Sequence, residues 1–93
     1  MNKAELVEEV AGKVGLTKKD AGNVVDAVTS AITDSLERNE RVTLVGFGMF
    51  EVRRRKARTG VNPQTRERLD IPAMNVVRFK AGKGLREKVR KQR

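Results

Sequence analysis

The sequence contains no cysteine, histidine, tryptophan or tyrosine. Without cysteine, the chain can form neither a disulfide framework nor a thiolate metal site, which fits a reducing compartment. The lack of histidine as well removes the commonest acid–base catalysts, nucleophiles and transition-metal ligands. Carboxylates remain, but most lie at spacings typical of a solvated helix face. We therefore expect no enzyme activity and no cofactor.

Long apolar runs are also missing, because none approaches the roughly 20 residues that a membrane-spanning helix needs. The first ten residues include three glutamates, so we expect no secretory signal there. These features favour a cytoplasmic location. The length of 93 residues predicts a single domain over residues 1–93.

Charge, in contrast, is plentiful and unevenly distributed. The chain has 21 Lys and Arg residues against 12 Asp and Glu, a net charge of +9. Residues 1–41 carry a net charge of −2, whereas residues 42–93 carry +11. A basic half joined to a mildly acidic half indicates that one part of the molecule holds a polyanion.

Helical periodicity marks residues 1–40. Asn2, with Glu5 three residues later, resembles a capping box, and an apolar stripe at Leu6, Val10 and Val14 predicts a helix of about three turns. Gly15 ends that helix. A second helix, with a broad apolar face, is predicted to begin at Thr17, whose capping partner is Asp20. It is predicted to end at about Arg38, where Asn39 suits a left-handed turn.

Beyond residue 40 the apolar period changes to two, which predicts strands. The expected strands cover residues 41–45, 49–52 and 76–79, with a tight turn at residues 46–48 between the first two. A short C-terminal helix follows, which Gly82 and Gly84 open and in which we expect Leu85 and Val89 to face inward.

A basic segment separates these strands. The alternation continues through residues 53–58, but the apolar face vanishes, so this strand must project into solvent or lie on a ligand. Residues 53–68 carry seven cations against one carboxylate, Glu67. Charges often protect an exposed strand edge, yet seven exceed that need, and arginine suits phosphates and narrow minor grooves. We expect residues 53–75, approximately, to form a hairpin arm that contacts nucleic acid.

The expected tip of the arm is Asn62-Pro63-Gln64-Thr65. Most Asn-Pro pairs are simple turns. On a basic ribbon, however, the rigid apolar ring of Pro63 could also wedge between base steps and kink a duplex.

Two smaller constellations leave alternatives open. In Lys80-Ala81-Gly82-Lys83-Gly84-Leu85-Arg86, the glycines could expose backbone N–H groups to a phosphate, or could serve only as the entry to a helix. Lys3 and Asp26 could pair across two packed helices, where a DNA phosphate would compete for Lys3, or could be independent surface charges.

The arm also bears on the oligomeric state. If it leaves the body, only about 70 residues remain to form a core, which is marginal for a single chain. Phe47, Phe50 and Phe79 would need cover. We therefore expect two chains to intertwine around one core with twofold symmetry.

Over essentially its whole length, the sequence resembles the bacterial HU and integration host factor family of nucleoid proteins. The most specific stretch comprises Gly46-Phe47-x-x-Phe50 followed by Arg55, Arg58, Gly60, Asn62, Pro63 and Thr65. The opening Met1-Asn2-Lys3-Ala4-Glu5-Leu6 and the closing Phe79-Lys80-Ala81-Gly82-Lys83-x-Leu85 also resemble the family.

This resemblance implies an α+β fold in an intertwined homodimer. Each chain would have an N-terminal helical hairpin for dimerisation (residues 1–40), then a three-stranded antiparallel sheet with a long β-ribbon arm and a short C-terminal helix (residues 41–93). The known binding mode of this family implies that the arms lie in the minor groove and that Pro63 of each subunit enters a base step. The implied DNA contacts are Arg53, Arg55, Arg58, Arg66 and Arg68 along the arm, Asn62 and Pro63 at its tip, and Lys3, Lys80, Lys83 and Arg86 on the body.

Three positions depart from the family pattern. Val61 stands where many relatives have a basic residue, Arg66 replaces a frequent glycine, and Val77 stands where HU proteins often have proline. The implied function is that of a bacterial nucleoid protein that binds duplex DNA with little sequence specificity, with distorted DNA preferred. A site-specific bending regulator of the integration host factor type, in a homodimer or with a paralogue, is the alternative. A dedicated RNA-binding role is disfavoured because the three phenylalanines lie in apolar contexts typical of a core and offer few stacking platforms. Some RNA binding beside DNA binding is compatible with the generic attraction of phosphate.

Overall fold

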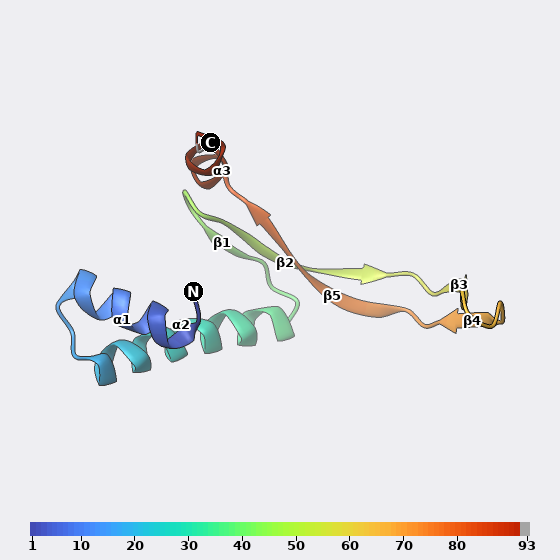
Figure 1. Cartoon of the computed structure of the whole chain (residues 1–93), viewed down its shortest axis with the longest axis horizontal. Coiled ribbons are helices and arrows are strands. Elements are labelled where there is room, and N and C mark those ends of the chain that lie inside the picture. Colours follow the sequence, from blue (N-terminus) through green and yellow to red (C-terminus); the bar gives the residue numbers. More distant parts are fainter. Residues whose placement is uncertain (92–93) are drawn as a thin grey trace. The chain divides into compact units, whose positions relative to one another are not determined.

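The computed structural model describes residues 1–91, which form three α-helices and five β-strands (Figure 1). The chain divides into two compact units. The first covers Met1–Ser35, and the second begins at Leu36. Each unit is described by itself.

The first unit opens with α1 (Lys3–Val14), and its two ends are set by local hydrogen bonds. The backbone N–H of Glu5 donates to Oδ1 of Asn2 at 2.9 Å, so the side chain of Asn2 satisfies a free helix donor. Gly15 adopts a left-handed conformation (φ 72°) and its N–H donates to the carbonyl of Ala11. Glycine reaches this conformation without a steric cost. Both predicted helix ends are confirmed.

Helix α2 (Lys18–Glu37) begins in the same way. The N–H of Asp20 donates to Oγ1 of Thr17 at 3.1 Å, as its predicted capping role requires. The helix ends one residue before the expected Arg38, and Asn39 takes the predicted left-handed conformation with φ 61°.

The buried core of the described residues is small. Its hydrophobic members are Ala11, Ala21 and Val25. Larger apolar side chains on the same two helices stay substantially exposed, including Val14 at 61% and Val28 at 51%. A single chain therefore leaves much of its apolar helical surface in contact with water.

The second unit contains a three-stranded antiparallel sheet in the order β1-β2-β5. Its strands are β1 (Val42–Leu44), β2 (Gly48–Arg55) and β5 (Met74–Ala81). The predicted turn at residues 46–48 is observed at residues 45–47. All three strand predictions are confirmed, and β2 and β5 are longer than expected because their pairing continues into the basic segment as far as Arg55 and Met74.

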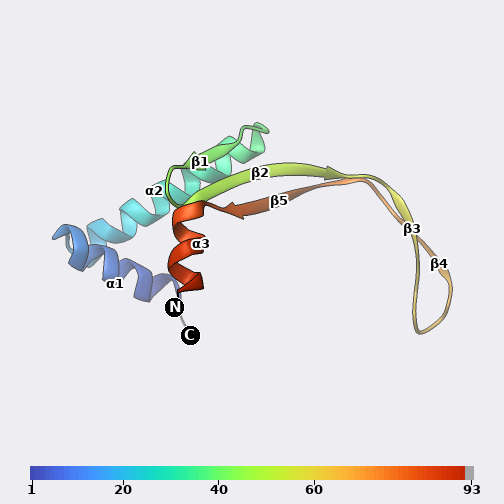
Figure 2. The ribbon, with the colours of Figure 1, turned by 90° about the horizontal axis from the view of Figure 1, so that it is seen from above.

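A two-stranded ribbon continues beyond the sheet. Strands β3 (Arg58–Val61) and β4 (Arg68–Ile71) pair antiparallel, from Arg58 opposite Ile71 to Val61 opposite Arg68. Figure 2 shows the ribbon bending where β2 and β5 give way to β3 and β4. Pro72 lies in this interruption, where its missing N–H removes no ladder hydrogen bond. The predicted hairpin arm is confirmed.

Helix α3 (Lys83–Arg90) follows β5 directly. Leu85 is half-buried, as expected, but Val89 is 59% exposed. The prediction that Val89 faces inward is therefore wrong for the single chain, because the second unit leaves that end of α3 uncovered.

The three phenylalanines of the second unit gather around β2 and β5. The ring of Phe79 lies 4.9 Å from that of Phe50 and 5.5 Å from that of Phe47, measured between centroids. Gly48 is buried beneath this cluster. A Cβ atom at Gly48 would lie 2.6 Å from two ring atoms of Phe79 and 2.8 Å from the carbonyl oxygen of Lys80. Only glycine fits there without a shift of backbone or ring.

We expect Gly48→Ala to lower the free energy of unfolding by about 1–3 kcal/mol, the usual cost of forcing extra volume into a packed site. Gly12→Ala is the matched control, because a Cβ atom there meets nothing within 4 Å and alanine favours helix over glycine by about 1 kcal/mol. Urea denaturation of both variants measures the difference. Equal free energies of unfolding for the two variants would show that the Phe79 ring shifts to make room at no cost in stability.

Candidate nucleic-acid interface

The register of β2 and β5 separates their side chains into two faces. Directly paired residues of an antiparallel ladder point to the same side, and successive residues alternate. The pairs Phe50 with Phe79 and Val52 with Val77 make one side apolar. We call the opposite side the basic face. Its members are Met49, Glu51, Arg53, Arg55, Met74, Val76, Arg78 and Lys80.

The basic face unites residues that are far apart in the sequence. Arg53 and Arg55 of β2 lie on it together with Lys80 of β5, so three of the predicted contacts share one surface. Arg54 lies on the other side, where its Nη1 donates to Oδ1 of Asn75 at 3.3 Å.

Arg78 is a cation of the basic face that the sequence reasoning missed. It stands directly opposite Glu51, and its side chain is 46% exposed. The available signal was its spacing of two residues from Lys80, since a strand places such residues on one side.

Further out, the ribbon carries cations on both sides. One side carries Arg58 opposite Ile71 and, two positions further along, Gly60 opposite Leu69. Arg68 is paired with Val61 on the other side. Arg58 and Arg68 are both exposed. The two predicted contacts therefore belong to one arm but point in opposite directions.

Hydrogen bonds centred on Asn62 organise the tip. Oδ1 of Asn62 accepts from the N–H of Gln64 at 2.9 Å, the backbone N–H of Asn62 donates to the carbonyl of Glu67 at 2.9 Å, and its carbonyl accepts from the N–H of Arg66 at 2.6 Å. This side chain folds the turn rather than reaching outward. Pro63 is exposed within the turn.

Arg66 completes the tip in an unusual conformation. Its φ of 61° is left-handed, which costs a residue with a Cβ atom about 1–2 kcal/mol. The conformation explains why glycine suits this position, and the guanidinium that replaces it adds an exposed charge three residues from Pro63.

At the other end of β5, Lys83 and Arg86 lie exposed on the first turn of α3. The glycines on either side of Lys83, Gly82 and Gly84, serve packing. The N–H of Gly82 donates to the carbonyl of Phe47 at 2.8 Å, and a Cβ atom at Gly84 would lie 3.1 Å from the carbonyl oxygen of Gly46. Of the two alternatives for this segment, the geometry favours a close-packed helix entry, with the cationic side chains left to meet an anion.

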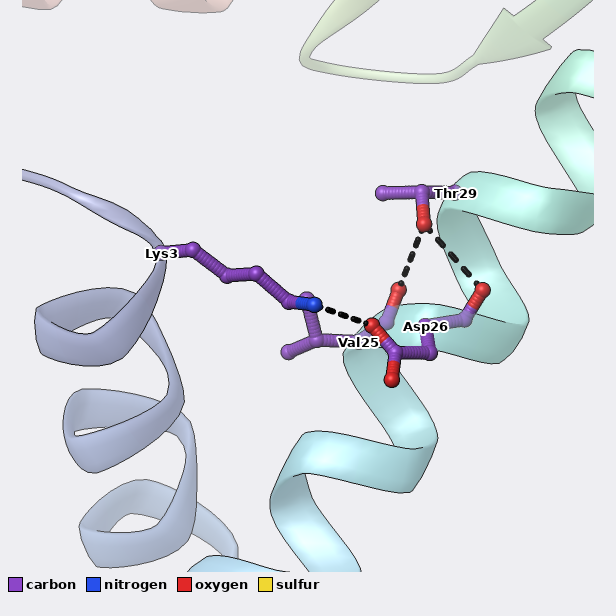
Figure 3. Close-up of polar contacts among 4 residues, drawn as sticks. All are labelled: Lys3, Val25, Asp26 and Thr29. Atoms are coloured by element: carbon purple, nitrogen blue, oxygen red, sulfur yellow. Dashed lines mark hydrogen bonds and ion pairs between the residues drawn. The ribbon is translucent and has the colours of Figure 1, made fainter.

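In the first unit, Lys3 and Asp26 form the predicted ion pair, with Nζ 2.7 Å from Oδ1 (Figure 3). Oγ1 of Thr29 donates to the carbonyls of Val25 and Asp26, both at 3.1 Å. The two charged side chains are 68% and 59% exposed. Such a pair is screened by water and contributes little to stability, so an incoming anion could compete for Lys3 at low cost.

Two further properties concern residues 1–91 only. No helix in this range has the length and apolar character of a membrane span. The same range contains no group of three or more His, Cys, Asp or Glu side chains placed to hold a metal ion.

Comparison with known proteins agrees with this architecture. DNA-binding protein HU of Staphylococcus aureus is 54% identical to the chain over 90 residues, which is 97% of this chain and 100% of the relative. The HU chain of an Anabaena HU–DNA cocrystal structure has 51% identity and a TM-score of 0.92, covering 99% of this chain and 100% of that one. HU from Thermotoga maritima has 38% identity and a TM-score of 0.69, covering 96% and 98%.

The family resemblance and its implied arrangement of helices, sheet and β-ribbon are thereby confirmed. Residues 1–90 match the family model for bacterial DNA-binding proteins. The chain belongs to this bacterial DNA-binding protein family, which includes HU.

Proposed function

We propose that this chain is a histone-like nucleoid protein that binds double-stranded DNA in the minor groove with little sequence specificity, bends it and compacts it. The observation that carries the proposal is the ribbon of β3 and β4, which has exposed cations on both faces and an exposed proline at its tip. The apolar residues that share the side of Arg58, Leu69 and Ile71, stay exposed or half-buried, so the ribbon is not covered by its own chain. The Anabaena relative that crystallised with DNA supports the same role.

The distribution of cations suits a groove better than a flat surface. A ribbon that lies in a minor groove has a phosphate wall on each side, so Arg58 and Arg68 can each face one wall although they point in opposite directions. Arg53 and Arg55 would continue the contact toward the body, and Arg66 would lie beside the base step that Pro63 enters.

The body would bind the flanking DNA. Lys80, Lys83 and Arg86 are exposed and would contact phosphates, and Lys3 would exchange its partner Asp26 for a phosphate. Asn62 would contribute mainly by holding the turn. Such contacts position a protein on DNA without reading its sequence.

The proposed assembly is a homodimer. The alternative assembly is a heterodimer of this chain and a paralogue. Several large apolar side chains of α1 and α2 stay exposed, among them Val14, Val24 and Val28, as is typical of a surface that a partner covers, and the buried residues are few and small. Residues 1–40 would form the dimerisation part of a single domain over residues 1–93, and residues 41–93 the DNA-binding part. Sedimentation at micromolar concentration should give a dimer, and a stable folded monomer would contradict this.

The test is a binding titration on linear, nicked and kinked duplexes at several salt concentrations. The logarithm of the binding constant should fall with the logarithm of salt concentration by about 0.9 per phosphate contacted, and kinked duplexes should bind more tightly than linear ones. A flat salt response, or preference for structured RNA over duplex DNA, would contradict the proposal. Selection from random DNA should return a broad A/T-biased pool, whereas a sharp consensus would indicate a site-specific regulator.

On this proposal the protein would lie in the bacterial nucleoid, within the cytoplasm, and would act without a cofactor or a chemical step. Its effect on DNA would come from charge neutralisation and deformation alone.

A further inference from the structure

A carboxylate lies in the middle of the basic face. Glu51 stands opposite Arg78, with Oε1 3.9 Å from Nη1 of the guanidinium. Arg53 is two positions along the same strand, and Lys80 is two positions along β5 from Arg78. Lys80 is thus a diagonal neighbour of Glu51, at a typical spacing of about 7–8 Å, whereas Arg53 lies about 7 Å along the same strand. Three cations thus surround one anion.

The exposures of the pair differ. The side chain of Glu51 is 20% exposed, whereas that of Arg78 is 46% exposed. Neighbouring atoms therefore cover the Glu51 side chain more than that of Arg78, which stays open to an approaching anion. At 3.9 Å the contact is a loose ion pair rather than a bidentate one, so N–H donors of Arg78 stay available to a second anion.

We infer that Arg78 is an additional phosphate contact of the sheet and that Glu51 competes with the phosphate for its guanidinium. This inference rests on the proposed DNA binding. Glu51 holds the guanidinium in a loose ion pair in the absence of DNA, and a phosphate then draws Arg78 away from it. Since the phosphate must also approach a carboxylate of like charge, Glu51 weakens the net grip of the sheet.

Arg54, on β2, is a matched control for the loss of the positive charge of Arg78. It has the same charge and is also bonded to a side chain of β5, Asn75. It points to the opposite side of the β2–β5 ladder from Arg78. Loss of Arg54 changes the net charge equally, but removes no contact on the basic face.

The experiment is a double-mutant cycle of Arg78→Ala and Glu51→Gln, with Arg54→Ala as the control for net charge. Binding of a linear duplex is measured by fluorescence anisotropy at several salt concentrations. We expect Arg78→Ala to weaken binding by about 3–10-fold and to lower the salt slope by about 0.9, the value for one phosphate contact. Arg54→Ala should leave the slope unchanged, and Arg78→Lys should restore it, because lysine keeps the charge.

Glu51→Gln should tighten binding several-fold. The loss on removing Arg78 should then be larger in the Glu51→Gln background than in the unaltered protein, because the guanidinium no longer has to leave a carboxylate. Thermal unfolding of each variant checks that the fold is intact, and Arg78→Gln replaces Arg78→Ala if the latter proves unstable.

The outcomes separate the two proposals. If Arg78→Ala matches Arg54→Ala in affinity and slope while the unaltered protein binds duplex with a steep salt dependence, Arg78 makes no contact and only this inference fails. Strictly additive effects in the cycle would exclude competition between Glu51 and the phosphate for Arg78. If the unaltered protein shows no salt-dependent binding, the proposed function itself fails.

Discussion

Replacement of Pro63 by alanine is expected to remove most of the DNA bending while leaving contact with linear duplex largely intact. Pro63 is exposed at the tip of the ribbon, and its ring can enter a base step without losing side-chain entropy. Unstacking a base step costs a few kcal/mol, and an apolar wedge in the opened step together with the added contacts of bent DNA offsets that cost. The preference for kinked over linear duplex should fall by about tenfold, or about 1.4 kcal/mol.

Energy transfer between the labelled ends of a duplex measures this bending. Gln64→Ala is the matched control, because Gln64 is exposed in the same turn and contributes its backbone N–H to the bond with Asn62. The control should bend DNA as the unaltered protein does. Unchanged bending by Pro63→Ala would exclude the wedge, and an equal loss of bending in both variants would point to the turn as a whole.

Neutralising the arm is expected to have the second large effect. A variant in which Arg53, Arg55, Arg58 and Arg68 are all replaced by glutamine should lose about four phosphate contacts. Its salt slope should then fall by about 3.6, and its affinity near 0.1 M salt by a factor on the order of 10²–10³. The four side chains are exposed, so their replacement should leave the fold intact.

The control must remove four positive charges elsewhere. Lys13, Lys18, Lys19 and Arg38 are exposed and lie outside the proposed contacts. Their replacement by glutamine lowers the net charge equally, and should weaken binding only through the long-range field. Anisotropy titrations across salt compare the two variants. Equal slopes would mean that the arm attracts DNA only by its net charge and does not grip it.

Arg58 and Arg68 allow a finer comparison within this set. If the arm lies in a groove, each of the two single replacements should lower the slope by a similar amount, because each faces a wall. If only one side of the arm contacts the DNA, one of the two replacements should leave the salt slope unchanged.

The sequence alone determined the ends of the helices and the nature of the arm. Asn2 and Gly15 form hydrogen bonds with backbone groups three and four residues away. Asn39 adopts the left-handed conformation that its residue type favours. The missing apolar face of residues 53–58 likewise identified the segment in which the three-stranded sheet gives way to a two-stranded ribbon. These signals are readable because each depends on a few neighbouring residues.

Only the tertiary structure decided which side chains act together. Arg54 and Arg53 are neighbours in sequence but lie on opposite sides, and Arg78 joins the basic face only because β5 pairs with β2 in this register. A slip of one residue would exchange the two faces. The need for glycine at position 48 likewise appears only when the ring of Phe79, 31 positions away in sequence, packs over it. Register and packing join residues that are distant along the chain, and no local pattern specifies them.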